Sequence, residues 1–374
     1  MIVPSGALEG VHGAVLRPGD QGYERARRVF NALVDRRPAL VVRPADPDDV
    51  GLALAYARQE QLPVTVRGSG YGFDGAAIGE GALTLDMRSL DAIHVDPDAR
   101  SVRCGAGVTW RILDEATQAH GLAVTGAWIS TLGVVGCSLG RGAGWLERTL
   151  GPTGSHVRGA TLVDAAGESV AVGPEGIRGG VITELELGLA PLGPRVLGGF
   201  MLYDGARADE VIETYVAAVG AAPDLTGGLV LLEAPHFDWI PERLRGGFIV
   251  AIVVLHPGEH ADADRALRPL RELRSAADLV RPTTYCQVQS LLDDLYPPGL
   301  LAAGAAGELA AVGADVRRAL VRGAKATPSL FNTVMLRPLP DSRWAVEVLA
   351  LWTDPRETAA QREWAHGVVQ SAGA

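Results

Sequence analysis

The stretch Pro63-Val-Thr-Val-Arg67-Gly-Ser-Gly-Tyr-Gly-Phe-Asp-Gly75 decides how the first half of the chain is interpreted. It begins as a short strand and passes directly into a loop with three glycines in five positions. Glycine reaches positive φ angles and permits close backbone approach, so successive N–H groups of such a loop can form a nest for an anion such as a pyrophosphate. A tight turn that binds nothing fits the same pattern, and this loop alone leaves both interpretations open.

The residues before this loop predict a parallel crossover unit. Residues 39–43 form a short apolar run, and residues 48–61 have apolar residues at helical spacing, with Asp48 or Asp49 as the expected N-cap. The strand at 63–67 then completes a strand–helix–strand order with short connections. After the loop, short alternating strands are expected at 83–86, 92–95 and 101–104, then a helix over 110–120, a hairpin of 160–163 with 169–172, and a strand at 181–187.

A second glycine-rich stretch, Trp128-Ile-Ser-Thr-Leu-Gly-Val-Val-Gly-Cys-Ser-Leu-Gly-Arg-Gly-Ala-Gly-Trp145, follows the predicted helix. Each glycine costs a helix interior about 1 kcal/mol relative to alanine, so this density predicts a loop. Ser130 and Thr131 add hydroxyl donors. Two such loops in one half of the chain predict a shared site, because unrelated turns explain the pair poorly.

The second half of the chain predicts a different architecture, with the boundary at Gly193-Pro194. Strands are expected at 199–203, 228–232, 248–255, 332–336 and 344–351, and helices at 206–219, 261–276, 308–324 and near 361–370. Antiparallel strands with helices on one face make an α+β lobe. A chain of 374 residues is too long for one ordinary core, so we expect two domains, at 1–193 and 194–374.

Composition excludes several classes of function. The net charge is −10, with no basic stripe, which argues against a nucleic-acid partner, and no apolar run approaches a membrane span. Lys325 is the single lysine, which argues against lysine-based covalent catalysis. Three cysteines fit neither a disulfide framework nor a zinc site, and no metal-ligand cluster is apparent. The N-terminus lacks a secretory signal, so the sequence predicts a cytoplasmic protein.

The two glycine loops and the segments around them resemble the FAD-linked oxidase superfamily with a PCMH-type FAD-binding domain, in particular the bacterial berberine-bridge-enzyme-like oxidases. The segments that carry this resemblance besides the loops are RPGDQGY (17–23), DRRPAL (35–40), LDMRSL (85–90), VDPDAR (95–100), GAGVTW (105–110) and QSLLDDLYPPG (289–299). The resemblance implies a two-lobed vanillyl-alcohol-oxidase-like fold, with an FAD-binding lobe at 1–193 and a substrate-binding lobe at 194–374.

The resemblance implies FAD as the cofactor and assigns its contacts residue by residue. The expected cofactor-binding residues are Arg67, Gly68, Ser69, Gly70, Tyr71, Gly75, Ser130, Thr131, Gly133, Gly136, Gly140, Arg141, Gly180 and Val181. Catalytic residues stay unknown, with Tyr71 and Asp74 as weak candidates beside simpler roles in filling volume and capping a turn.

Several family features are missing from this sequence. Relatives link the flavin covalently through a histidine where this chain has Tyr71, and some add a cysteine link where it has Ile129. Arg141 replaces a glycine of the second loop. The glycine-rich loop before residue 181 is shortened, LLAAG at 300–304 replaces an aromatic–lysine cluster, and the usual C-terminal return segment beside the flavin is not expected.

These departures leave three hypotheses. The first is a non-covalent FAD-dependent oxidoreductase acting on a small organic, secondary-metabolite-like substrate. The second is a flavin-free, non-redox enzyme of the cyclase or pericyclase type, which would lower a barrier by holding a reactive conformer in an apolar cavity. The third is a binding protein without catalytic activity. The phosphate-facing glycines are retained while the ring-facing residues are depleted, so the first is the family default.

Overall fold

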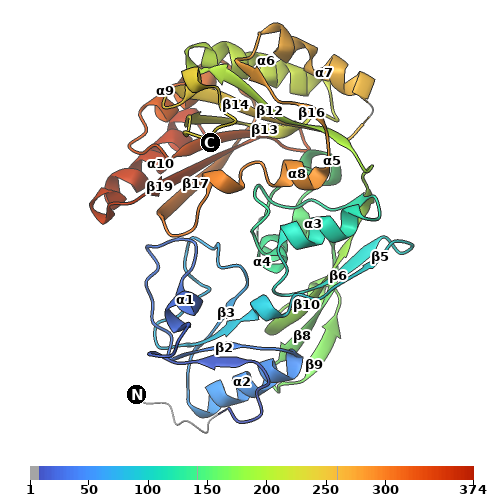
Figure 1. The fold of residues 1–374 in the computed structure, drawn as a ribbon, viewed down its shortest axis with the longest axis vertical. Helices are drawn as coiled ribbons and strands as arrows, with labels where there is room; N and C mark the ends of the chain where they lie inside the picture. The colour runs from blue at the N-terminus through green and yellow to red at the C-terminus, as the bar shows by residue number, and fades with distance from the viewer. Residues whose placement is uncertain (1–7, 141, 259) are drawn as a thin grey trace. The chain divides into compact units, whose positions relative to one another are not determined.

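The computed structural model describes residues 8–140, 142–258 and 260–374. The chain divides into two compact units (Figure 1). Unit 1 comprises residues Met1–Ala143, Pro152–Pro191 and Pro297–Gly299, and unit 2 comprises Gly144–Gly151, Leu192–Tyr296 and Leu300–Ala374. The assignment of residues 1–193 as an FAD-binding lobe and of residues 194–374 as a substrate-binding lobe stays a prediction.

The first sheet of unit 1 contains the predicted crossover unit. Its strand order is β1-β2-β4-β3, with β2 (Leu40–Arg43), β4 (Leu83–Asp86) and β3 (Val64–Arg67) parallel and β1 (Ala14–Leu16) antiparallel to β2. Helix α2 (Pro47–Gln59) connects β2 to β3. Strand β4 was expected to be the first of the short alternating strands after the glycine loop, but it lies between β2 and β3 in the parallel sheet. The short alternating strands therefore begin with β5.

The N-cap of α2 differs from the prediction. Asp46, and not Asp48 or Asp49, caps the helix by accepting a hydrogen bond of 3.0 Å from the backbone N–H of Asp49. Pro47 occupies the first turn, where a missing N–H costs nothing, and this places the cap one residue before it.

The second sheet of unit 1 is antiparallel, in the order β5-β6-β10-β8-β9. Strands β8 (Val157–Asp164) and β9 (Ser169–Val172) form the predicted hairpin, and β10 (Gly180–Gly188) has the predicted alternation of buried and half-buried residues. The remaining elements are β5 (Ile93–Asp96), β6 (Ser101–Gly105), β7 (Leu122–Ala123), β11 (Ala190–Pro191), α1 (Tyr23–Arg27), α3 (Trp110–Gln118) and α4 (Val134–Leu139).

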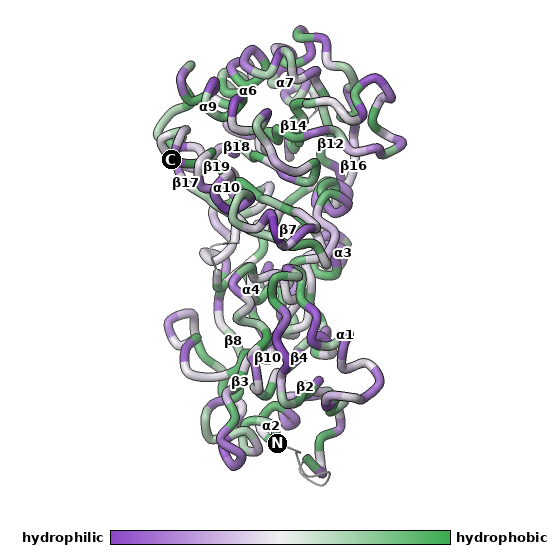
Figure 2. The backbone as a smooth tube through the Cα atoms, turned by 90° about the vertical axis from the view of Figure 1, so that its left-hand side faces the viewer, coloured by the Kyte–Doolittle hydropathy of each residue, from purple (hydrophilic) through white to green (hydrophobic). Residues whose placement is uncertain are grey.

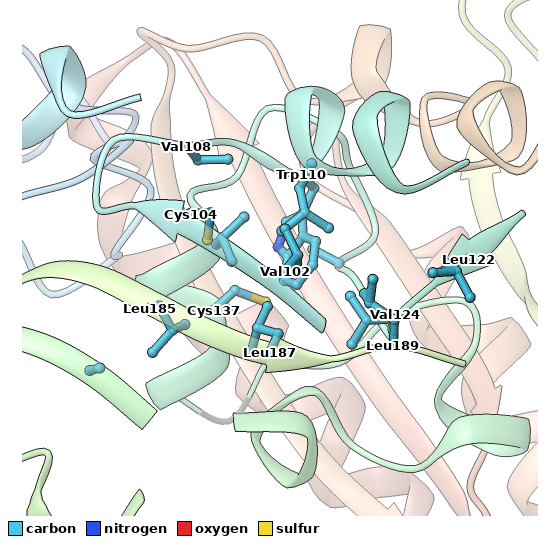
Figure 3. Close-up of a cluster of buried hydrophobic side chains, with 14 residues drawn as sticks. Val102, Cys104, Val108, Trp110, Leu122, Val124, Cys137, Leu185, Leu187 and Leu189 are labelled. Carbon is cyan, nitrogen blue, oxygen red and sulfur yellow. The ribbon is translucent and has the colours of Figure 1, made fainter. Parts of the chain in front are cut away.

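The short helix α4 corrects the expectation that the second glycine-rich stretch contains no helix. Its six residues lie between Gly133 and Gly140, and only Gly136 falls inside it. The helix tolerates one internal glycine because tertiary packing stabilises it: Val134, Cys137 and Ser138 are buried. Figure 3 shows Cys137 beside Leu187 in the core cluster that also contains Trp110, Val102 and Cys104.

Unit 2 is built on an antiparallel sheet in the order β15-β12-β14-β13-β18-β19-β17, and β16 also pairs with β12. The helices α6, α7, α9 and α10 back one side of this sheet (Figure 1). The strands are β12 (Val196–Asp204), β13 (Thr226–Glu233), β14 (Phe248–His256), β15 (Ala277–Asp278), β16 (Arg281–Thr283), β17 (Leu301–Leu309), β18 (Thr333–Pro338) and β19 (Trp344–Trp352). The helices are α5 (Glu147–Leu150), α6 (Ala208–Ala221), α7 (His260–Glu272), α8 (Tyr285–Gln289), α9 (Ala314–Lys325) and α10 (Thr358–Ala372).

Strand β17 was not predicted, and it shortens the helix expected at 308–324. Its sequence, Leu-Ala-Ala-Gly-Ala-Ala-Gly-Glu-Leu, has no β-branched residue, so its propensity does not indicate a strand. Pairing with β19 along its full length, from Leu301↔Trp352 to Leu309↔Trp344, overrides that propensity. Helix α9 therefore begins only at Ala314.

Hydropathy along the chain alternates over short distances in both units (Figure 2). Within the described part of the chain, no helix combines the length and apolar character that crossing a bilayer requires.

Candidate functional site

Both glycine-rich loops line one cleft of unit 1, with a volume of about 480 Å³. This volume lies within the range of small-molecule and cofactor sites. The lining residues come from the first loop, the second loop and the adjoining strands: Val66, Gly68, Ser69, Gly70, Tyr71, Gly72, Ala77, Met87, Ala106, Leu132, Gly133, Val135, Gly136, Cys137, Gly140, Gly142, Gly180, Val181 and Ile182. The structure thus brings together the two loops that the sequence assigns to a shared site.

Side-chain hydrogen bonds join the two loops directly. The Tyr71 hydroxyl and the Thr131 Oγ1 atom are 2.8 Å apart, and Ser69 Oγ accepts a 2.7 Å hydrogen bond from the backbone N–H of Gly133. A side chain at position 133 would crowd the second contact, because a Cβ atom there would lie 3.1 Å from Ser69 Oγ and 3.2 Å from its backbone nitrogen. The loops therefore form one continuous wall of the cleft.

The Tyr71 ring is fixed by its neighbours. It stacks on Phe30, with ring centroids 4.7 Å apart and an interplanar angle of 21°. The backbone N–H of Phe30 donates a 2.9 Å hydrogen bond to the carbonyl of Gly70, which holds the two segments together. Tyr71 is thus held from both ends, by stacking along its ring and by hydrogen bonding at its hydroxyl.

Glycines leave open space at the cleft surface. A Cβ atom at Gly136 would meet no other heavy atom within 4 Å, and one at Gly68 would meet only the Ala106 carbonyl, at 3.7 Å. At Gly142, by contrast, a Cβ atom would lie 2.3 Å from the Cys137 carbonyl oxygen, so glycine is required there for chain packing. Gly136 and Gly68 consequently form a cradle in which a ligand can approach the backbone closely.

The described lining of the cleft is nearly free of charge. Its titratable side chains are Tyr71 and Cys137, and the other polar side chain is Ser69. An anionic group bound here would therefore be stabilised mainly by backbone N–H groups, as in the nests that bind phosphates. A glycine cradle with neutral walls can hold a diphosphate through backbone N–H groups beside a flat aromatic ring system.

Other expected cofactor residues are placed elsewhere. Arg67 is buried, donates to the Ala26 carbonyl, and is not part of the cleft lining; burial lowers its pKa to about 10. Gly75 packs against Val34, where a Cβ atom would lie 2.7 Å from a methyl group. Asp74 accepts a 3.0 Å hydrogen bond from the Ala76 N–H, which is the turn-capping role.

The remaining assignments divide in the same way. Ser130 is buried, and Thr131 is hydrogen-bonded to Tyr71 but is not part of the described cleft lining, whereas Gly180 and Val181 line the cleft at the start of β10. Arg141 lies outside the described residues. Whether any of these residues contacts FAD stays a prediction.

Apolar lining residues were missed by the sequence analysis. Met87, Ala106 and Cys137 all face the cleft, and none has a side chain that indicates a ligand. Met87 and Ala106 lie in two of the segments that carry the family resemblance, at 85–90 and 105–110. Their place in these segments was the sequence feature that could have indicated a position at the cleft.

His12, Asp46 and Asp49 form a second cluster of polar groups, with potential ligand atoms within 4.8 Å of one another. Asp49 accepts hydrogen bonds from the backbone N–H groups of His12, Gly13 and Ala45, and Asp46 caps α2. These contacts explain the cluster as an anchor between the N-terminal segment and α2.

Comparison with known proteins agrees with this geometry. Residues 38–173 match the FAD binding domain family. The chain is 27% identical to (R)-6-hydroxynicotine oxidase of Paenarthrobacter nicotinovorans over 294 residues, which are 75% of this chain and 63% of that protein. It is 28% identical to an FAD-linked oxidoreductase of Dictyostelium discoideum over 306 residues, 78% of this chain and 65% of that protein. The chain thus spans less than two thirds of either relative.

Solved structures show the same fold. The TM-score is 0.85 with 6-hydroxy-D-nicotine oxidase from Arthrobacter nicotinovorans, at 23% identity and covering 97% of this chain and 86% of that one. It is 0.82 with berberine bridge enzyme from Eschscholzia californica, at 15% identity and covering 97% and 82%. Residues 38–173 therefore match the FAD binding domain family, and the chain has the same fold as 6-hydroxy-D-nicotine oxidase and berberine bridge enzyme.

Proposed function

We propose that this protein is an FAD-dependent oxidoreductase that holds its flavin without a covalent bond and acts on a small organic substrate. The observation that carries the proposal is the glycine cradle, where Gly136 and Gly68 leave open space beside a neutral wall formed by both loops. The sequence similarity of the chain to FAD-linked oxidoreductases supports the same proposal.

The residues of the cleft would hold FAD in two ways. Backbone N–H groups of the two loops would bind the diphosphate, and the apolar side chains of Met87, Val135 and Val181 would exclude water from the rings. When bound, FAD supplies the hydride-accepting chemistry, and the protein contributes orientation and a dry cavity. Tyr71 is the one hydroxyl-bearing ring of the described lining, which makes it a candidate to orient a polar group of the bound molecule.

Attachment of the flavin should be non-covalent. Tyr71 takes the position of the histidine link in relatives, and its hydroxyl is engaged with Thr131. Ile129, in the position of the second link, is a buried aliphatic residue without a nucleophilic atom. Unit 2, with its broad antiparallel sheet, is the candidate substrate-binding lobe. A secondary-metabolite substrate and a cytoplasmic location stay predictions.

The visible absorption spectrum of the purified protein, before and after incubation with FAD, tests the proposal. We expect bands in the blue and near-UV, and we expect the flavin to remain in the supernatant after acid precipitation of the polypeptide. Flavin that precipitates with the polypeptide would contradict non-covalent attachment. A folded protein that binds no FAD at micromolar concentration would overturn the proposal as a whole.

A flavin-free, non-redox enzyme of the cyclase type is the second candidate. The observation that favours it is the Tyr71 ring, which lines the cleft, stacks on Phe30 and is hydrogen-bonded to Thr131, at the position that the sequence resemblance assigns to a flavin-linking histidine. Such an enzyme would show no flavin absorption and would convert its substrate without an electron acceptor. The absorption experiment therefore separates the two candidates.

A further inference from the structure

A second cleft of unit 1, with a volume of about 410 Å³, is lined by three arginines. It lies at the ends of β2 and β4 and beside α1. The lining residues are Ala14, Leu16, Gln21, Gly22, Arg25, Arg43, Arg88 and Ser89. None of the described lining residues carries a negative charge, so the cleft concentrates positive charge in a chain whose net charge is −10.

One buried carboxylate balances two of these arginines. Asp86 is fully buried and accepts four hydrogen bonds, from Arg43 Nε at 3.1 Å and Nη2 at 2.9 Å, and from Arg88 Nε and Nη2 at 2.7 Å each. Burial raises the pKa of Asp86, but the hydrogen bonds and charge of Arg88, the charge of Arg67 and the hydrogen bonds from Arg43 together outweigh it and keep the pKa below its usual value. Asp86 thus fixes the orientation of both guanidiniums. Their Nη1 groups take no part in these four bonds and keep donors for a ligand.

Positively charged groups outnumber negatively charged ones beside this cleft. Arg67 is buried near the same carboxylate, and its pKa falls to about 10 because of burial and the repulsion of Arg88 and Arg43. The single negative charge of Asp86 is thus opposed by three guanidiniums, those of Arg67, Arg43 and Arg88. Arg25, on the exposed side of the cleft, has no carboxylate partner among the described residues and adds a further cation. A bound anion would relieve this repulsion.

We propose that this arginine cleft binds the phosphate group of a small molecule. Guanidinium groups present two parallel donors that match phosphate geometry, and two of them here are held in place by Asp86. The volume suits a small molecule, and the acidic chain as a whole repels a nucleic-acid strand, which argues for a small phosphate ligand and against a polyanion.

This site is separate from the glycine cradle. Met87 lines the glycine cleft, whereas the next two residues, Arg88 and Ser89, line the arginine cleft. The 3-10 turn Met87–Ser89 therefore divides the two clefts. A phosphate bound by the arginines would be additional to the diphosphate of FAD.

Titration calorimetry with three probes at constant ionic strength in chloride tests the site. Inorganic phosphate and ribose 5-phosphate should bind, and ribose should not. Arg25→Ala should weaken phosphate binding about tenfold, because it removes one charge-assisted interaction. Arg103→Ala is the matched control, since Arg103 is an exposed arginine of β6 outside the cleft, and it should leave binding unchanged. Tighter binding of ribose 5-phosphate than of inorganic phosphate would identify a phosphate ester as the ligand class, and the reverse would identify free phosphate.

Three results would overturn the proposal. The first is the absence of phosphate binding to the wild type at millimolar concentration. The second is equal binding by the wild type and Arg25→Ala, which would place the anion elsewhere. The third is competition, in which saturating FAD abolishes phosphate binding and thereby shows that the two ligands use one site. Because the apo-protein is titrated first, the result does not depend on whether FAD binds.

Discussion

The hydroxyl oxygen of Tyr71 lies 2.8 Å from Oγ1 of Thr131, and this hydrogen bond connects two glycine-rich loops that are 60 residues apart in the sequence. Glycine-rich loops lose much conformational entropy when they become ordered. A direct link between them lowers the entropy that ligand binding must still remove, which is preorganisation of the site. At the position to which the sequence resemblance assigns a covalent flavin link, this chain has a hydrogen-bonded tyrosine.

Tyr71→Phe should weaken FAD binding by about twofold to tenfold, which corresponds to the loss of one net hydrogen bond. The stacking on Phe30 should survive, so the fold should not change. Quenching of flavin fluorescence on titration measures the affinity. Tyr56→Phe is the matched control, because the buried Tyr56 hydroxyl has no hydrogen-bond partner within the described part of unit 1. Equal FAD affinity of Tyr71→Phe and the wild type would contradict the role assigned to this bond.

Gly136→Ala should have opposite effects on stability and on FAD binding. The new methyl group meets no atom within 4 Å, and alanine favours helix α4, so the unfolding free energy should rise by about 0.5–1 kcal/mol. The same methyl group fills part of the cradle, and a clash of about 1.4 kcal/mol or more would lower FAD affinity at least tenfold.

Gly367→Ala provides the control for this substitution. Gly367 lies inside α10, and a Cβ atom there also meets nothing within 4 Å. It should stabilise the protein similarly in thermal unfolding while leaving FAD affinity unchanged. Unaltered FAD binding by Gly136→Ala would show that the cradle is not occupied by the cofactor.

Periodicity predicted the elements in which burial alternates or spacing is helical. The strand β10 and the helix α2 were found because one face of each is buried and the other is not. The hairpin of β8 and β9 was found because the turn residues at 164–167 join two short apolar segments. Strand β17 could not be predicted, because alanine and glycine give no strand propensity and its position depends on pairing with the distant β19. Tertiary context decides such segments.

The candidate site was predictable as two loops but not as a set of side chains. Arg67 was expected at the cofactor, yet Val66 lines the cleft, and successive residues of strand β3 point to opposite faces. Because Val66 and Gly68 line the cleft, period-two alternation places Arg67 on the other side. The Tyr71–Thr131 contact, by contrast, depends on how two loops meet in space, and no local pattern encodes that.

Asp114→Asn should stabilise the protein at neutral pH and reduce its pH dependence. Asp114 is fully buried in α3, neither of its oxygens has a hydrogen-bond partner among the described residues, and burial raises its pKa well above the usual value. Between the unfolded-state pKa of about 3.9 and the raised folded-state pKa, the folded state binds the extra proton. The unfolding free energy therefore falls as the pH rises, by at most about 1.4 kcal/mol per pH unit.

Urea unfolding between pH 4 and pH 7 measures this effect. The stability difference between Asp114→Asn and the wild type should grow as the pH rises through this window. Asp98→Asn, which neutralises an exposed aspartate of unit 1, should show the pH dependence of the wild type. Parallel stability curves for Asp114→Asn and the wild type would mean that Asp114 is not protonated in the folded state.

Arg148→Ala should destabilise unit 2 by about 2–3 kcal/mol, because it removes charged hydrogen bonds at a helix end. Arg148 Nη1 donates to the carbonyls of Ala222, at 2.9 Å, and Leu225, at 2.6 Å, and Nη2 donates to that of Val219, at 2.8 Å. Helix α6 ends at Ala221, so one guanidinium binds carbonyls at the helix end and in the segment that follows it, and places a cation at the negative end of the helix dipole.

Differential scanning calorimetry of three variants tests this role. Arg148→Lys keeps the charge but not the fork of donors, so its melting temperature should fall between those of Arg148→Ala and the wild type. Arg318→Ala is the control: Arg318 pairs with the exposed Asp315 one helical turn away, and such surface pairs contribute at most about 1 kcal/mol. If Arg148→Ala melted no earlier than Arg318→Ala, water would satisfy the carbonyls of Val219, Ala222 and Leu225 equally well, and the guanidinium would be unnecessary to the end of this helix.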